Sequence, residues 1–279
     1  MKTLKKQTLI LLSISSLLLV GLAVFAHIHK KEEKPSYSNL NSKASLNEVR
    51  SILSKHLDEE SVDNFINLVT DYNDTVGSVG LSGSFAPFTK TDYDVEKISS
   101  LWTAKHGDFI GTNCRINTYT LLKGKIKIPQ VKSDTELLFQ DKDAIDKGKL
   151  FNAKDQANFD ILFSRVKTEA TQDVKVHAKH MEAYYKQFTF DDKARMLSVV
   201  VHDNLDGDFL FVGHVGVLVP TTDGYLFVEK LTFEEPYQAI KFASKKDCYK
   251  YLTTKYKDYT GPGLSKPFIM DNGKWVDMD

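Results

Sequence analysis

The first half of the chain carries apolar residues at helical spacing. A first predicted helix opens with the capping-box pattern Ser45-Leu-Asn-Glu48. Its apolar face consists of Val49, Ile52, Leu53 and Leu57. The same spacing returns over residues 62–72 and again over 92–105, with a glycine-containing loop between the two segments. These patterns predict a helical first half.

The second half changes to β-rich runs. Residues 196–201, 209–219 and 225–230 are dominated by branched and aromatic side chains, and turn residues separate the runs. Near the end, Asn272-Gly273 stands between apolar flanks, which is a strong signal for a hairpin. Helices followed by an antiparallel sheet predict an α+β fold.

The N-terminal segment has the pattern of an export signal. Lys2, Lys5 and Lys6 precede an uncharged run that extends to Ala26. Residues 1–26 are therefore predicted to be a signal peptide or a membrane anchor, because the apolar stretch nearly reaches the length of a bilayer span. A lipid anchor on an N-terminal cysteine is excluded, since the first cysteine is Cys114.

The remainder divides into a tether and a domain. Residues 27–45 are polar and charged and are predicted to form a flexible tether, because they cannot bury a core. Residues 46–279 are predicted to form one α+β domain. The protein is thus expected to be exported, either secreted or held at the outer face of the cytoplasmic membrane.

Composition narrows the class of protein further. The chain has 279 residues with 42% apolar residues, which is enough for a sizeable core. It has 37 basic and 37 acidic residues, and removal of the three lysines in residues 1–26 leaves 34 basic ones. A mildly acidic chain without a basic block is not expected to bind nucleic acid. Two cysteines exclude a disulfide framework and a four-thiolate zinc site.

Cys114 is the candidate for chemistry. Gly111-Thr-Asn-Cys114 indicates a turn that runs into a helix, so the thiol lies at the first helical turn. Unpaired backbone N–H groups and the cation of Arg115 favour a thiolate there. Asn113 and the backbone N–H of Cys114 are the candidate donors for an oxyanion, and Arg115 supports them.

A thiolate nucleophile needs an imidazole and a third polar group that orients the imidazole. His214 is the best of eight histidines, because it lies in a β run between glycines that leave the strand surface open. If residues 220–224 form the turn, the numbers of paired residues add up to about 443 or 444. His214 then lies opposite Glu229 or Lys230, and Glu229 interrupts an apolar run as an orienting carboxylate.

Two resemblances follow from these motifs. Asn-Cys114 at a helix start, Gly-His214-Val-Gly-Val-Leu-Val and Leu-Phe-Val-Glu229 resemble the NlpC/P60 branch of the papain-like cysteine peptidases. The resemblance implies a papain-like fold, with Cys114 as nucleophile, His214 as base and Glu229 as orienting residue. The region from about Leu40 to the end also resembles an uncharacterised family of exported Gram-positive surface proteins, through Phe227-Val-Glu-Lys230, Glu235-Pro-Tyr-Gln238 and the closing hairpin.

The leading interpretation is an exported cysteine hydrolase that cleaves an amide in peptides or cell-wall peptide stems. It needs no cofactor and no metal, and it meets a membrane only through residues 1–26. An acyltransferase with the same residues and a non-catalytic surface binding module on the same fold remain open.

Several alternative interpretations of single residues also stand at this point. Cys114 could form a disulfide with Cys248, and Glu229 could pair with Lys230 or Lys125. His177 and His180 have the helical spacing of metal ligands, with Glu182 nearby, but lack a third ligand. Asp203-Asn-Leu-Asp-Gly-Asp208 lacks the distal glutamate of a calcium loop and is predicted to be a hairpin turn.

Overall fold

The computed structural model describes residues 34–77, 79–89 and 92–278. The predicted signal segment, residues 1–26, and the start of the predicted tether lie outside the described residues. One structural unit begins at Pro35 and continues to the C-terminus. None of the helices in the described part of the chain has the length and apolar character needed to cross a membrane.

Helices dominate the first half and strands the second half, as the hydrophobic pattern predicts. The helices are α2 (Lys43–Leu53), α3 (Glu59–Val76), α4 (Val95–His106), α5 (Cys114–Leu122), η1 (Glu136–Leu138), α6 (Phe139–Gly148), α7 (Ala153–Leu162), α8 (Val174–Tyr185) and α9 (Lys245–Tyr256). The strands are β1 (Ser36–Ser38), β2 (Ala86–Pro87), β3 (Ile126–Lys127), β4 (Val166–Lys167), β5 (Thr189–Phe190), β6 (Arg195–Asp203), β7 (Phe209–Pro220), β8 (Tyr225–Lys230), β9 (Tyr237–Phe242), β10 (Phe268–Asp271) and β11 (Lys274–Trp275). The predicted α+β class is confirmed.

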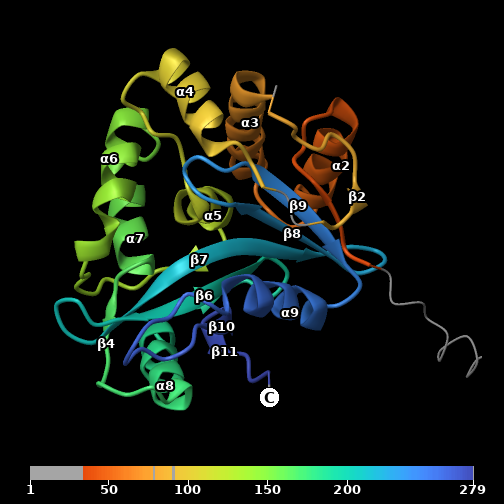
Figure 1. Ribbon diagram of the computed structural model, residues 1–279. Helices are drawn as coiled ribbons and strands as arrows, with labels where there is room; N and C mark the ends of the chain where they lie inside the picture. Colours follow the sequence, from red (N-terminus) through yellow and green to blue (C-terminus); the bar gives the residue numbers. More distant parts are fainter. Residues whose placement is uncertain (1–33, 78, 90–91, 279) are drawn as a thin grey trace, which may run out of the picture. The chain divides into compact units, whose positions relative to one another are not determined.

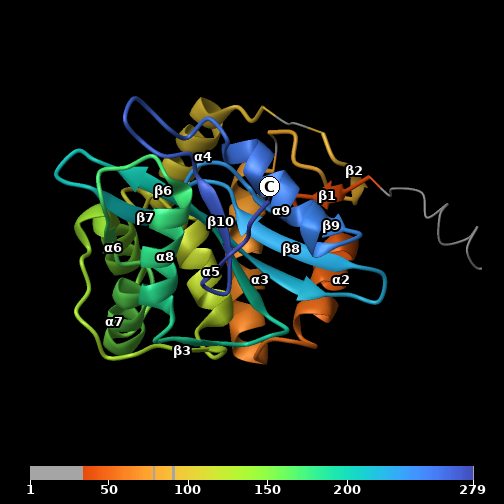
Figure 2. The ribbon, with the colours of Figure 1, turned by 90° about the horizontal axis from the view of Figure 1, so that it is seen from below.

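The main sheet is antiparallel and has β6 to β9 at its centre. Among the described residues its strand order is β11-β10-β6-β7-β8-β9-β1-β2, and β4 pairs with β7 beside this path. Figure 1 shows α2 to α5 on one face of this sheet and α9 on the other, and Figure 2 shows the same arrangement from below. The predicted hairpin between β10 and β11 is confirmed, with Asn272 at φ 51° and Gly273 at φ 72°.

Two apolar clusters occupy the two faces of the sheet. The larger cluster joins α2 to α8 to one face and contains Cys114. The smaller cluster joins α9 to the other face and contains Cys248. Both cysteines are buried and free, so the alternative of a Cys114–Cys248 disulfide is wrong. The sheet separates the two thiols.

The N-terminal boundary of the domain is a correction to the sequence prediction. Strand β1 lies inside the predicted tether, residues 27–45, and pairs with β9 and β2. Leu40 is buried in the larger cluster, and α2 is capped by Ser42, whose side chain accepts from Ser45 N–H. The helix therefore begins about one turn before Ser45, where the sequence pattern predicted its cap. A strand of three residues is too short to show a periodicity, and its partners β2 and β9 lie about 50 and about 200 residues further along the chain.

Candidate active site

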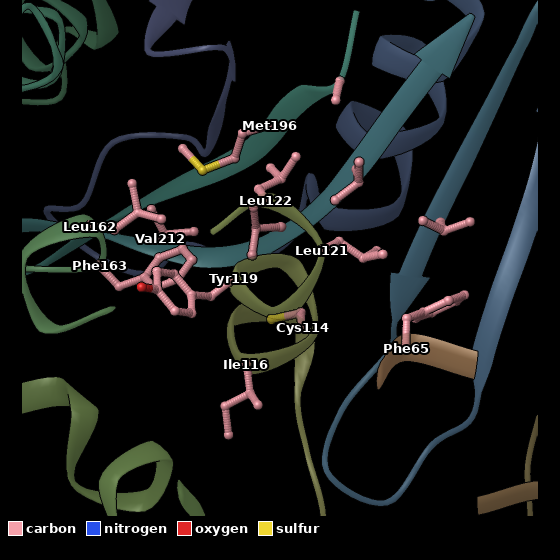
Figure 3. Packing of buried hydrophobic residues seen from close by; sticks show 14 of the residues in the cluster. Phe65, Cys114, Ile116, Tyr119, Leu121, Leu122, Leu162, Phe163, Met196 and Val212 are labelled. Carbon is pink, nitrogen blue, oxygen red and sulfur yellow. The ribbon is translucent and has the colours of Figure 1, made fainter. Parts of the chain in front are cut away.

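Cys114 is the first residue of α5 and lies between the helix and the sheet. Asn113 caps the helix, since its Oδ1 atom accepts from the Ile116 N–H at 3.0 Å. The chain reaches this cap through Gly111 at φ 91°, a conformation that favours glycine. Figure 3 shows the Cys114 side chain at the N-terminal end of α5, among apolar residues of the larger cluster. The residue is 5% exposed.

Asn113 and Arg115 are both bound to one buried carboxylate. The Asn113 Nδ2 atom donates to Asp141 Oδ1 at 2.7 Å. Arg115 donates to both oxygens of Asp141, at 2.9 and 2.7 Å, and to the Val212 carbonyl at 3.0 Å. These side chains fix the start of α5 against α6 and β7. The Asn113 side chain, predicted as a donor for an oxyanion, is thus bound to Asp141 and to the Ile116 N–H, and the Cys114 backbone N–H remains the candidate donor.

His214 follows a bulge in β7. His214 pairs with Val199 of β6, but Val212 pairs with Val200, so Gly213 is an extra residue in β7. The sequence suggested that the neighbouring glycines leave the strand surface open. The structure shows instead that this surface is closely packed. A Cβ atom on Gly213 would meet Val201 at 2.6 Å, and one on Gly216 would meet the Phe227 ring at 2.4 Å. Both glycines permit close packing, and His214 is only 2% exposed.

His214 and Glu229 form a short hydrogen bond across two strands. The His214 Nε2 atom lies 2.5 Å from Glu229 Oε2. Paired residues of β7 and β8 have numbers that add to 445, as in Val217 with Val228, so the predicted sums of 443 and 444 are wrong. Glu229 lies on the same face as His214 at the diagonal position, which is within reach of long side chains. Glu229 pairs with neither Lys230 nor Lys125.

The thiol of Cys114 interacts with the other side of this imidazole. The charge and hydrogen bonding of His214 act on the Cys114 thiol, and because Nε2 is bound to Glu229, Nδ1 is the nitrogen left for this interaction. Paired residues of β7 and β8 end at Val217 and Val228, although both strands continue. Cys114 belongs to the apolar cluster on the α5 face of the sheet, whereas Glu229 is bound by Tyr251 of α9 on the other face, so His214 interacts with groups from both faces.

The electrostatics of the pair favour a thiolate and an imidazolium. Burial alone raises the pKa of the Cys114 thiol, but the charge and hydrogen bond of His214 and the charge of Arg115 bring it below its ordinary value. Burial alone lowers the pKa of His214, but Cys114 and Glu229 raise it above its ordinary value. Each group therefore stabilises the charged form of the other.

Glu229 is completely buried and is held by residues that the sequence did not single out as site residues. Its Oε1 atom accepts from Gln238 Nε2 and from the Tyr251 hydroxyl, both at 2.6 Å, and Lys255 Nζ lies 3.7 Å away. Burial raises the pKa of this carboxyl, but Lys255, His214 and Tyr251 outweigh burial and hold it at about 2. Gln238 is the direct strand partner of Glu229 in β9. For Tyr251 and Lys255, the only signal in the sequence is their spacing of four residues, which places them on one side of α9.

The comparison with known families gives one result. The family model described as a domain of unknown function (DUF4300) matches residues 36–276. The chain belongs to the DUF4300 family. No curated protein and no solved structure matches it. The start of the match agrees with β1, the first strand of the domain.

An aromatic side chain covers the imidazole in this DUF4300 domain. The Tyr256 ring stacks on His214 with a centroid distance of 4.7 Å and an interplanar angle of 23°. Tyr259 packs against Tyr256 at 5.3 Å and is itself 58% exposed. From solvent inward, Tyr259 therefore packs on Tyr256, and Tyr256 packs on the imidazole of His214.

A buried lysine organises the turn beside the site of the DUF4300 domain. Lys230 follows Glu229 and lies on the opposite face of β8, where its Nζ atom donates to the carbonyls of Thr232, Phe233 and Glu235. The ammonium lies over the Tyr72 ring at 4.2 Å from the centroid. Burial lowers the pKa of Lys230 to about 7. Lys230 thus fixes the turn between β8 and β9.

The other candidate motifs are accounted for by ordinary contacts. His177 is buried between the Thr168 hydroxyl at 2.7 Å and the Thr171 carbonyl at 2.8 Å. Within the residues that the structure describes, no group of three or more His, Cys, Asp or Glu side chains could hold a metal ion. Residues 204–208 connect Asp203, the last residue of β6, to Phe209 of the antiparallel strand β7, so the prediction of a hairpin turn is confirmed.

Proposed function

We propose that this DUF4300 protein is an exported thiol hydrolase of papain-like architecture that cleaves an amide bond. Its substrates are peptides or cell-wall peptide stems, and it meets them outside the cytoplasmic membrane after export directed by residues 1–26. Cys114 is the nucleophile, His214 is the general base and acid, and Glu229 orients the imidazole.

One observation carries the proposal. The thiol at the start of α5, the imidazole on β7 and the carboxylate on β8 are joined in one hydrogen-bonded series, and the pKa of Cys114 lies below its ordinary value. A buried structural cysteine has the opposite shift, as Cys248 does, because burial raises its thiol pKa well above the ordinary value. The two cysteines of one chain thus provide an internal comparison.

In the acylation step, the Cys114 thiolate attacks the carbonyl carbon of the scissile amide. The C–N bond breaks as the His214 imidazolium gives its proton to the leaving amine, which leaves a thioester on Cys114 and a neutral imidazole. The developing oxyanion is stabilised by the Cys114 backbone N–H, one of the donors that a helix leaves unpaired in its first turn. Glu229 stabilises the imidazolium before this transfer.

In the deacylation step, the neutral imidazole of His214 accepts a proton from water while the water oxygen attacks the thioester. The acyl group leaves as a carboxylic acid, and the thiolate–imidazolium pair is restored. An acyltransferase follows the same course with an amine or hydroxyl of a second substrate in place of water. The residues are the same for both reactions.

A second candidate function is a non-catalytic surface module, and the burial of the site favours it. Cys114, His214 and Glu229 are 5%, 2% and 0% exposed, so the groups that catalysis requires are almost completely buried. A fold can persist after its chemistry is lost. In that case the network of Glu229 serves stability alone.

The test compares the full-length protein with Cys114→Ala, using a fluorogenic peptide library and purified cell-wall peptide stems as substrates. We expect amide cleavage by the wild type and none by Cys114→Ala or His214→Ala. Cys248→Ala removes the other thiol from the far face of the sheet and should keep the activity. Cleavage that survives Cys114→Ala, or a wild-type Cys114 that alkylates with an ordinary thiol pKa, would overturn the proposal.

A further inference from the structure

The carboxylate of Glu229 has an unusually complete set of partners. One oxygen, Oε2, is bound to His214, and the other, Oε1, accepts from Gln238 and Tyr251. These two donors are also bound to each other, since Gln238 Nε2 donates to the Tyr251 hydroxyl at 2.8 Å. Lys255 Nζ donates to the same hydroxyl at 2.9 Å. The hydroxyl of Tyr251 thus receives two hydrogen bonds and gives its own proton to Glu229.

Helix α9 brings two of these side chains to the sheet. Cys248 and Leu252 bury the helix in the smaller apolar cluster, and Ser244 caps its start by accepting from the Asp247 N–H. Tyr251 and Lys255 are one turn apart on this helix, so they meet Glu229 together. The helix lies on the face of the sheet opposite α5 (Figure 1). Tyr251 therefore contacts the carboxylate from the α9 side, whereas Cys114 belongs to the apolar cluster on the α5 side.

A glutamate in this place needs such support. Its side chain has one more rotatable bond than an aspartate, and each of its oxygens can accept a hydrogen bond from the imidazole. Without partners for Oε1, the buried carboxylate would lose the hydrogen bonds that stabilise its charged form. With both donors in place, Oε2 is the oxygen that is left for His214.

We propose that Tyr251 and Gln238 are positioning residues of the catalytic series: they hold Oε1 of Glu229, and so present Oε2 of an ionised carboxylate to His214. A role of these two residues in catalysis rests on the proposed function, whereas their positioning of Glu229 does not. The hold of Tyr251 and Gln238 on the carboxylate affects the pKa of His214 whether or not the protein cleaves an amide.

The chain provides a matched control for Tyr251→Phe. Tyr249 lies on the same helix, and its hydroxyl donates to a different carboxylate, Asp271, at 2.5 Å. Tyr249→Phe therefore removes the same O–H to carboxylate hydrogen bond from α9 without touching Glu229. A loss of helix stability would appear in both variants, whereas a loss of Glu229 positioning would appear only in Tyr251→Phe.

The first measurement is the pH dependence of Cys114 alkylation by iodoacetamide on the full-length protein. For Tyr251→Phe we expect the apparent thiol pKa to rise by about one unit, which lowers the rate about tenfold on the acid side of the profile. Tyr249→Phe should follow the wild type. In a Glu229→Gln background, Tyr251→Phe should cause no further change, because its effect passes through the carboxylate.

The second measurement is the titration of His214 by NMR on histidine-labelled protein. We expect the pKa of His214 to fall in Tyr251→Phe and in Gln238→Met, and to stay at the wild-type value in Tyr249→Phe. Equal profiles for Tyr251→Phe and Tyr249→Phe, or a Tyr251→Phe effect of full size in the Glu229→Gln background, would overturn the inference. An unreactive Cys114 overturns the proposed function instead, and the His214 titration still decides the positioning role.

Discussion

His214 Nε2 lies 2.5 Å from Glu229 Oε2, although the two residues are diagonal neighbours and not a direct pair of the β7–β8 ladder. The β8–β9 register explains why the contact is well defined. Glu229 is paired directly with Gln238, whose amide takes the other carboxylate oxygen. Neighbouring strands thus supply the imidazole, the carboxylate and one of the groups that hold the carboxylate.

Glu229→Gln should change the acid stability of the domain. The pKa of Glu229 is about 2 in the folded chain and about 4.5 for the ordinary group, so the folded state binds fewer protons between these values. The ionised carboxylate then stabilises the wild type above pH 4.5, and up to about 3 kcal/mol of this is lost as the pH falls toward 2. Urea unfolding at several acidic pH values should show a shallower loss for Glu229→Gln. Parallel pH curves for both proteins would contradict this assignment.

Iodoacetamide should label one cysteine of the native protein. Cys114 has a lowered thiol pKa, whereas Cys248 is 0% exposed and burial raises its thiol pKa. Because the thiolate is the reactive form, we expect label on Cys114 and none on Cys248. Mass spectrometry of peptides from the native and the denatured protein checks this, since denaturation should expose both thiols. Labelling of Cys248 in the native protein would show that the smaller cluster opens.

His214→Gln should return the reactivity of Cys114 toward that of an ordinary thiol. After burial, the charge and hydrogen bond of His214 have the largest effect on the Cys114 pKa, and both lower it. Without the imidazolium we expect alkylation below pH 7 to slow by at least about tenfold, as for a rise of one pKa unit. Because burial then raises the thiol pKa without this opposing effect, the difference should persist through the ordinary thiol pKa and vanish only at higher pH, where the variant also carries a thiolate. His180→Gln changes an exposed histidine and serves as the control.

The pattern of side chains predicted that Cys114, His214 and Glu229 come together, although it did not predict the strand register between them. The turn between β7 and β8 spans Thr221 to Gly224, which makes Pro220 and Tyr225 the last pair. The predicted pairing differs from this by one or two residues. Glu229 was still identified correctly as a partner of His214, because positions two residues apart on a strand share a face and their side chains reach diagonally.

The residues that hold Glu229 could not be predicted in the same way. Gln238 follows the turn that Lys230 fixes through backbone carbonyls, and such a contact leaves no periodic signal. Tyr251 has helical spacing with its neighbours, but this spacing is equally consistent with a residue that only packs in the core. Its contact with Glu229 follows only once the face of the sheet that α9 covers is known. Strand β1 is similar, because its place depends on pairing with β9. These features are set by tertiary contacts.

Asp141→Asn should destabilise the fold strongly. Asp141 is 0% exposed and binds Arg115 through both oxygens, so its loss leaves a buried guanidinium without its counter-charge. Removal of one partner from a buried ion pair costs about 3–5 kcal/mol. The neighbouring Lys142→Ala breaks a more exposed pair with Asp160 and should cost no more than about 1 kcal/mol. Urea unfolding of both variants measures the difference, and equal midpoints would contradict the structural role of Asp141.

Tyr256→Leu should make the thiol accessible to larger reagents. The Tyr256 ring covers one face of the His214 imidazole, and Tyr259 packs on Tyr256 from the solvent side. Leucine keeps an apolar contact with the smaller cluster but removes the flat ring above the imidazole. We expect the alkylation rate with a bulky maleimide to rise relative to the rate with iodoacetamide, because the small reagent depends less on the width of the opening. Tyr249→Leu alters a tyrosine of the same helix that bonds to Asp271, and it should leave the ratio of the two rates unchanged. If the ratio is the same in Tyr256→Leu and the wild type, reagents reach Cys114 by a route that does not pass Tyr256.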